Sequence, residues 1–177
     1  MKACPQTESQ SVLEHGFSVK NYTMDLLNHL EQGTTLKYEW KLPEWIYEEK
    51  DLIPQHLAGR KTLKTYTIMH DCGKPLCLQI DEEGKRHFPN HAEISFQTFV
   101  RFYDDPVAAQ LILHDMDIHT LKSEGVEEFS KSPYAITHLI VGLAEIHSNA
   151  KMFGGIDSSI SKTKQTINLT KNNQKTK

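Results

Sequence analysis

Cysteine is scarce in this sequence, and long apolar runs are missing. Three cysteines, Cys4, Cys72 and Cys77, stand in 177 residues, and their odd number excludes a complete disulfide framework and favours a reducing compartment. No second cysteine pair accompanies Cys72 and Cys77 to complete a structural zinc site. No apolar stretch approaches the roughly 20 residues that cross a bilayer, and the segment MKACPQTESQ lacks the apolar part of a signal peptide. We therefore expect a cytoplasmic protein without a membrane segment.

An excess of positive charge is also missing. The formal net charge is -3, so overall charge gives no reason to expect a polyanionic partner, although a local basic site remains compatible with it. The length and composition match one globular domain, which we predict over residues 1–160. Residues 161–177 contain five lysines and no acidic residue, which predicts a disordered tail, with a weak tether to nucleic acid as the alternative.

The spacing of apolar residues predicts a compact all-α fold of six or seven helices with no convincing strand. Gly33 is expected to stop the first helix, and Gly154 and Gly155 the last. The run of residues 72–95 contains repeated glycine and proline and predicts a long functional loop. Helices are expected over residues 11–30, 43–53, 61–70 (where a strand is the alternative), 91–102, 106–115, 126–129 and 133–146.

The number of histidines stands out, with ten in the sequence. The stretch IMHDCGKP places His70 directly before Asp71 at the end of a predicted helix, with Gly73 expected to let the backbone turn sharply. His15 lies upstream on one amphipathic helix, and Asp115 lies downstream on another, after His114. Two imidazoles and two carboxylates from three helices form a mixed nitrogen and oxygen ligand set suited to Mn, Co, Ni, Fe or Mg.

These motifs resemble the HD-domain phosphohydrolases, whose metal ligands follow the order H…HD…D. The match consists of VLEHGFSV around His15, IMHDCGKP around His70 and Asp71, and LILHDMDIH around Asp115. The segment RHFPNHAEIS is similar to the HDxGK branch, which includes HD domains of CCA-adding tRNA nucleotidyltransferases and of polynucleotide kinase-phosphatases. The HDxxE pattern of many HD nucleotidases is absent because Lys74 stands in the glutamate position, which argues against a simple nucleotidase.

The resemblance implies a compact HD-domain fold and a divalent metal ion held by His15, His70, Asp71 and Asp115. It implies a phosphohydrolase that cleaves a phosphomonoester or a 2',3'-cyclic phosphodiester on a nucleotide or nucleic-acid end. Two alternatives stay open. One is hydrolysis of free nucleotides, such as a cyclic mononucleotide, a dinucleotide or a triphosphate, and the other is a non-catalytic metal-binding HD module.

Further residues receive roles around this centre. Asp71 offers two carboxylate oxygens, so it could bridge to a second metal beside His87 and His91; a single metal with substrate-contacting histidines is the favoured interpretation. A histidine four residues after Asp115 is expected on the same helical face, where it could protonate a leaving alkoxide. Lys74 and Arg86 are candidates to bind phosphate oxygens. The predicted catalytic residues are Asp71, Lys74 and His119, and the predicted substrate-binding residues are Lys74, Arg86, His87, His91 and Lys151.

Overall fold

The computed structural model describes residues 1–150, and the chain divides into two compact units. Among the described residues, unit 1 consists of Met1–Lys20 and Gly59–Met116, and unit 2 consists of Asn21–Ala58 and residues 117–150. Each unit is assembled from two separate stretches of chain, and the first boundary falls inside a helix. The composition of the sequence therefore gives no sign of this division. The predicted tail over residues 161–177 lies outside the described residues.

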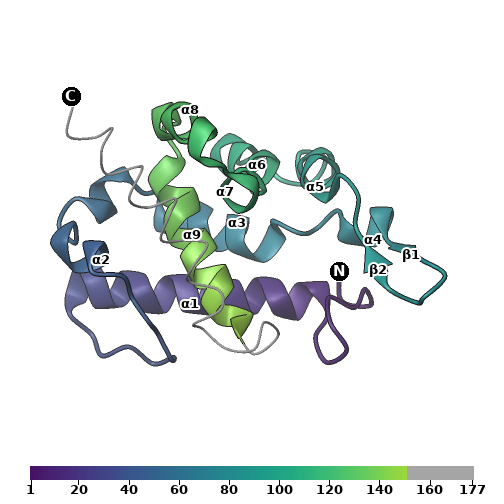
Figure 1. Cartoon of the computed structure of the whole chain (residues 1–177), viewed down its shortest axis with the longest axis horizontal. Helices are drawn as coiled ribbons and strands as arrows, with labels where there is room; N and C mark the ends of the chain where they lie inside the picture. Colours follow the sequence, from purple (N-terminus) through teal and green to yellow (C-terminus); the bar gives the residue numbers. More distant parts are fainter. Residues whose placement is uncertain (151–177) are drawn as a thin grey trace. The chain divides into compact units, whose positions relative to one another are not determined.

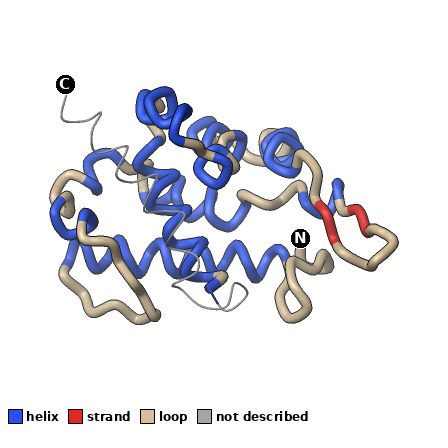
Figure 2. Tube along the Cα trace, in the orientation of Figure 1, coloured by secondary structure: helices blue, strands red, loops and turns tan. Residues whose placement is uncertain are grey.

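The described part of the chain is predominantly helical, which confirms the all-α prediction (Figure 1). Six of its helices have six residues or more. Apart from one isolated bridge, strand structure in residues 1–150 is limited to a hairpin of two-residue strands (Figure 2). The elements of unit 1 are α3 (Arg60–Met69), α4 (Lys74–Cys77), β1 (Gln79–Ile80), β2 (Arg86–His87), α5 (His91–Phe99), α6 (Pro106–Leu113) and the first turns of α1 (Val12–Gln32). Those of unit 2 are the rest of α1, α2 (Trp45–Glu48), η1 (Ile53–His56), α7 (Asp117–Thr120), η2 (Ser123–Gly125), α8 (Val126–Lys131) and α9 (Ala135–Ser148).

Helix α1 begins and ends at local signals in the sequence. The Ser11 backbone N–H and hydroxyl donate to Glu14 Oε2 at 2.8 and 2.7 Å, and the Glu14 N–H donates back to Ser11 Oγ at 3.2 Å. This reciprocal pair is a capping box, which satisfies backbone donors that the first helical turn leaves open. Hydrogen bonds from Ser11 lower the pKa of Glu14. Gly33, at φ 66°, follows the last turn as predicted, since glycine adopts this left-handed conformation without steric cost.

The predicted long loop over residues 72–95 is more ordered than we expected. It contains α4, with Pro75 in its first turn, and the antiparallel hairpin in which Gln79 pairs with His87 and Ile80 with Arg86. Gly84 has φ 78° at the hairpin turn, and Asn90 has φ 53° just before α5. The prolines and glycines of this run therefore close short turns between small elements, and do not leave an irregular segment.

The prediction that one helix carries both Asp115 and His119 is wrong. Helix α6 ends at Leu113, Asp115 lies in the turn that follows, and His119 belongs to the separate helix α7. The apolar spacing continues through this region, so it gives no sign of the break. The last helix, α9, ends at Ser148, whereas the glycines expected to stop it lie outside the described residues.

Each unit has its own buried apolar residues. In unit 1, α3 and α5 both pack against α6, and the three helices carry fully buried side chains such as Leu63, Phe99 and Leu111. The core of unit 2 comprises Leu26, Trp45, Ile46, Ile53, Phe129, Ala135, Leu139, Ile140 and Leu143. Within residues 1–150, none of the helices combines the length and the apolar character needed to cross a bilayer.

Candidate metal centre

Asp71 is the centre of a buried cluster in unit 1. It follows α3 and is 1% exposed. On one side of its carboxylate, Oδ2 lies 3.7 Å from His15 Nε2, 3.3 Å from His70 Nε2 and 2.7 Å from Lys74 Nζ. On the other side, Oδ1 lies 3.6 Å from His91 Nε2. The fold thus brings three imidazoles and one ammonium group to a single carboxylate.

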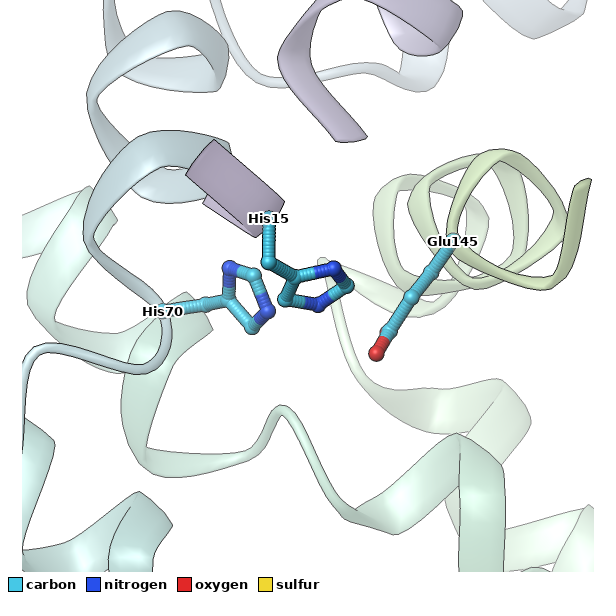
Figure 3. A group of neighbouring side chains, drawn as sticks. All are labelled: His15, His70 and Glu145. Carbon is cyan, nitrogen blue, oxygen red and sulfur yellow. The ribbon is translucent and has the colours of Figure 1, made fainter. Parts of the chain in front are cut away.

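Gly16 explains how His15 reaches His70. A Cβ atom on Gly16 would overlap the carbonyl oxygen of Ile68, so only glycine allows α1 to approach the last turns of α3 this closely. The rings of His15 and His70 consequently meet edge to face, with centroids 5.1 Å apart and an interplanar angle of 66°. Figure 3 shows these two rings pointing toward the same space.

Gly73 has a different role from the predicted one. Its backbone is right-handed, with φ -83° and ψ -16°, so no sharp turn requires glycine there. A Cβ atom on Gly73 would instead overlap the backbone of Ile94 and Ser95 in α5. The Gly73 N–H donates to the buried Ser95 hydroxyl at 2.9 Å, and the Cys72 thiol donates to the Ser95 carbonyl at 3.3 Å. This close contact holds α5, which begins at His91, beside Asp71.

The hydrogen bonds of His70 and His91 fix which ring nitrogen faces Asp71. His70 Nδ1 donates to the Thr67 carbonyl at 2.9 Å, and His91 Nδ1 donates to the Phe88 carbonyl at 3.0 Å. Because a carbonyl only accepts, Nδ1 carries the proton, and the Nε2 atom of a neutral ring directs a lone pair at a carboxylate oxygen. Two lone pairs face each other favourably only when a proton or a metal cation lies between them. Metal-ligating histidines commonly show this arrangement, with the second nitrogen donating to a backbone carbonyl.

The donor set fits a divalent cation. His15, His70 and Asp71 are 0%, 2% and 1% exposed, so they offer nitrogen and oxygen ligands shielded from water. Two ligands of one cation, each about 2.0–2.2 Å from it, lie about 3.0–3.5 Å apart, close to the distances from Asp71 Oδ2 to the two imidazoles. Ligand atoms of His15 and His70 also lie within 4.8 Å of each other. These buried histidine and aspartate groups could therefore hold a metal ion, and the mixed set favours no particular one among the expected metals.

Asp115, the fourth predicted ligand, is held by Tyr66. The Tyr66 hydroxyl donates to Asp115 Oδ1 at 2.6 Å, and the carboxylate is 4% exposed. Tyr66 lies one helical turn before His70, so Asp115 is placed beside the end of α3. The ligand role of Asp115 stays a prediction. We did not identify Tyr66 from the sequence, because a tyrosine within the apolar pattern of a helix looks like an ordinary core residue.

Lys74, a predicted phosphate-binding residue, is buried. It is 8% exposed, and its ammonium group donates to Asp71 Oδ2 at 2.7 Å and to Gln6 Oε1 at 3.2 Å. The same nitrogen lies 5.2 Å from the centre of the Phe88 ring, within cation–π distance. Gln6 and Phe88 could not be predicted from the sequence, since neither residue type suggests a metal or phosphate site.

The two histidines proposed for a second metal lie against different carboxylates. His91 faces Asp71, whereas His87 Nε2 lies 2.6 Å from Asp81 Oδ2 across the hairpin. The His87 side chain is 46% exposed, and its hydrogen bond is the main cause of the lowered pKa of Asp81. Arg86, on the same strand, is partly exposed. Arg86 and His87 therefore belong to an exposed hairpin that leads into the buried centre through Phe88.

Two predicted residues, His119 and Lys151, do not belong to unit 1 as described. His119 is in unit 2, where its Nε2 atom lies 3.0 Å from Glu145 Oε2 on α9. Figure 3 includes this glutamate, which belongs to unit 2. Lys151 lies outside the described residues.

No protein-family model matches this chain, and neither the curated proteins nor the solved structures compared with it contain a match. The relation to HD phosphohydrolases is therefore a resemblance carried by the sequence motifs.

Proposed function

We propose that this protein is a metal-dependent phosphohydrolase that cleaves a phosphomonoester or a 2',3'-cyclic phosphodiester at a nucleotide or nucleic-acid end. The observation that carries the proposal is the orientation of the histidines around Asp71. His70 and His91 each donate through Nδ1 to a backbone carbonyl and direct Nε2 at opposite oxygens of the Asp71 carboxylate. This arrangement supports a cation centre built on Asp71.

His15, His70 and Asp71 would hold the metal, with Asp115 as the proposed fourth ligand. A bound divalent ion would polarise a phosphoryl oxygen and lower the pKa of a water molecule. Asp71 and Asp115 would offset its two positive charges, so the Lys74 ammonium leaves the centre with one positive charge in excess. Such an excess of positive charge favours an anionic substrate. Phosphate groups are anions that lysine ammonium groups commonly bind.

Residues of the chain also suit the binding of phosphate. Lys74 reaches the centre from α4 and presents its charge at the carboxylate that faces the histidines. Arg86 lies on the hairpin that ends at Phe88, beside the Lys74 ammonium. We expect the phosphoryl group of the substrate to bind at Lys74. The rest of the substrate would then contact the hairpin, where Arg86 and His87 are accessible. A guanidinium group binds two phosphate oxygens at once, which suits a nucleic-acid end.

The choice of substrate rests on the resemblance of HDCGKP and RHFPNHAE to the branch that processes nucleic-acid ends. The centre itself recognises phosphate and is indifferent to what the phosphate is attached to. Hydrolysis of free nucleotides therefore stays the alternative, and a substrate panel separates the two. Oligonucleotides that outperform the matching mononucleotides would support an end-processing enzyme, and the reverse order would support a nucleotide phosphohydrolase.

Turnover by the purified protein tests the proposal. Mn²⁺, Co²⁺, Ni²⁺, Fe²⁺ and Mg²⁺ are supplied in turn with 3'-phosphorylated oligonucleotides, cyclic-phosphate oligonucleotides, free nucleotides and an aryl phosphate. Asp71→Asn should abolish turnover, and Asp51→Asn, which changes an exposed aspartate of unit 2, should leave it unchanged. No turnover of any substrate with any metal would overturn the proposal.

Metal content separates the catalytic proposal from the non-catalytic alternative. Asp71→Ala should reduce the metal that co-purifies with the protein or is taken up on dialysis. If the metal is lost while the wild-type protein shows no turnover, the site has a structural or sensing role. If the variant keeps the wild-type metal content, the proposed centre is wrong.

A further inference from the structure

Lys74 and two of the proposed metal ligands converge on the same oxygen atom. Oδ2 of Asp71 accepts a hydrogen bond from the Lys74 ammonium at 2.7 Å, and it faces His70 Nε2 at 3.3 Å and His15 Nε2 at 3.7 Å. A cation ligated by these two imidazoles and Oδ2 would share that oxygen with an ammonium group. Two positive charges on one carboxylate oxygen repel each other, and burial leaves this repulsion poorly screened by salt.

The surroundings of Lys74 keep the ammonium near this oxygen. Gln6 Oε1 accepts a hydrogen bond from Lys74 Nζ at 3.2 Å, and the Phe88 ring lies 5.2 Å from it. Gln6 belongs to the segment before α1, and Phe88 follows the hairpin, so two separate parts of unit 1 hold the side chain. Lys74 is 8% exposed, so its ammonium group cannot move into bulk water without breaking these contacts.

We infer that Lys74 makes metal binding and phosphate binding depend on each other. The ammonium lowers the affinity of the Asp71 centre for a divalent cation alone. A phosphate oxygen placed between the ammonium and the cation offsets their repulsion, so phosphate restores the affinity. Because coupling between two ligands is reciprocal, the cation raises phosphate affinity by the same factor. This inference rests on the metal centre of the proposed function, and it names the phosphoryl group as the ligand that regulates that centre.

Metal binding measured by calorimetry tests the coupling without any turnover. Mn²⁺ is titrated into the full chain with and without inorganic phosphate, for the wild type, Lys74→Met and the control Lys61→Met. Lys61 is an exposed lysine on α3 of the same unit, so its replacement removes one charge without touching Asp71. Phosphate should raise the Mn²⁺ affinity of the wild type and of Lys61→Met about tenfold or more, a typical size for coupling between sites.

Lys74→Met should bind Mn²⁺ alone about tenfold more tightly than the wild type, because the competing charge is gone. Its remaining gain from phosphate should be about tenfold smaller than that of the wild type. An unchanged or weaker Mn²⁺ affinity of Lys74→Met in the absence of phosphate overturns the inference. So does a phosphate effect equal to that of the wild type.

If Lys74→Met does not fold, a measurement on the wild-type protein can test the inference instead. In protein labelled with ¹⁵N-lysine, the Lys74 ammonium signal should shift on addition of Zn²⁺ and shift again on addition of phosphate. A signal that stays in place while Zn²⁺ binds overturns the inference. Failure of the proposed function can be distinguished from failure of this inference. If Mn²⁺ and phosphate bind cooperatively but no substrate is turned over, the enzymatic role is wrong and the coupling is retained.

Discussion

His91 Nε2 lies 3.6 Å from Asp71 Oδ1, on the carboxylate oxygen opposite the one that faces His15 and His70. Asp71 is therefore contacted by imidazoles on both of its oxygens. The Nδ1 atom of His91 donates to the Phe88 carbonyl, which orients the ring toward the carboxylate. This places His91 at the centre itself, either as a direct ligand or as a group that orients Asp71.

Replacing His91 should weaken metal binding. His91→Gln is expected to lower Mn²⁺ affinity at least about tenfold, the effect seen when ligands or their orienting partners are removed. Calorimetric titration measures this affinity. His87→Gln is the matched control, because His87 contacts Asp81 on the exposed hairpin. Equal affinities of His91→Gln and the wild type would exclude His91 from the centre.

Gly16 and Gly73, which lie beside the proposed metal ligands, should tolerate no side chain. Gly16→Ala and Gly73→Ala place a Cβ atom against the backbone of α3 and α5, which cannot yield as a flexible side chain would. Each should lower the free energy of unfolding by about 2 kcal/mol or more, as overpacking of buried sites does. Urea denaturation measures this loss. Gly59→Ala is the control, because no atom lies within 4 Å of its added Cβ, and its change should stay within about 0.5 kcal/mol. If Gly16→Ala and Gly73→Ala lose no more unfolding free energy than Gly59→Ala, the helices can move apart easily and the close contacts are not required.

The proximity of three predicted residues could be read from the sequence, whereas the contacts that hold them together could not. His15, His70 and Asp71 come together as the order of the motifs led us to expect. The importance of Gly73, in contrast, depends on the approach of Ser95, which lies 22 residues away in the chain. A contact between residues so far apart leaves no local pattern in the sequence, so the sequence predicts only a turn at Gly73.

The errors in the fold have a similar origin. The stretch after α6 keeps its apolar spacing while the helix ends, so Asp115 and His119 seemed to share one helix. The hairpin has two residues in each strand, too few for alternation to be visible. The Asp81–His87 pair formed by this hairpin was therefore not expected. Apolar spacing over residues 11–30 and the stop at Gly33 did predict helix α1, because both signals are local in the sequence.

The buried His147 should make unit 2 less stable in acid. Its Nδ1 atom donates to the Leu143 carbonyl at 2.7 Å, and its Nε2 atom accepts the Lys41 N–H at 3.1 Å. Burial is the main cause that lowers its pKa from the ordinary value of 6.5. Between the lowered pKa and 6.5 the unfolded chain binds the proton and the folded chain does not, so stability is full above pH 6.5 and falls as the pH decreases below it.

Chemical denaturation between pH 5 and pH 8 measures this dependence. His147→Gln should be less stable than the wild type at pH 8, because the Lys41 and Leu143 contacts are disturbed, and the difference should narrow toward pH 5. His56→Gln, which changes an exposed histidine of unit 2, should keep the wild-type slope. A constant difference between His147→Gln and the wild type at all pH values would contradict the assignment of the neutral ring.

The hydroxyl of Tyr66 should be required for the position of Asp115. Tyr66→Phe keeps the buried ring and removes the donor to Asp115 Oδ1, which leaves a buried carboxylate short of one hydrogen bond. The expected cost is about 1–3 kcal/mol in the free energy of unfolding. If Asp115 is a metal ligand, Mn²⁺ affinity should also fall by about tenfold, since the partner that orients it is lost. Tyr103→Phe is the control, because Tyr103 is exposed and stacks on Phe99 through its ring. A loss of stability with unchanged Mn²⁺ affinity would place Asp115 in the structure of unit 1 and outside the metal centre.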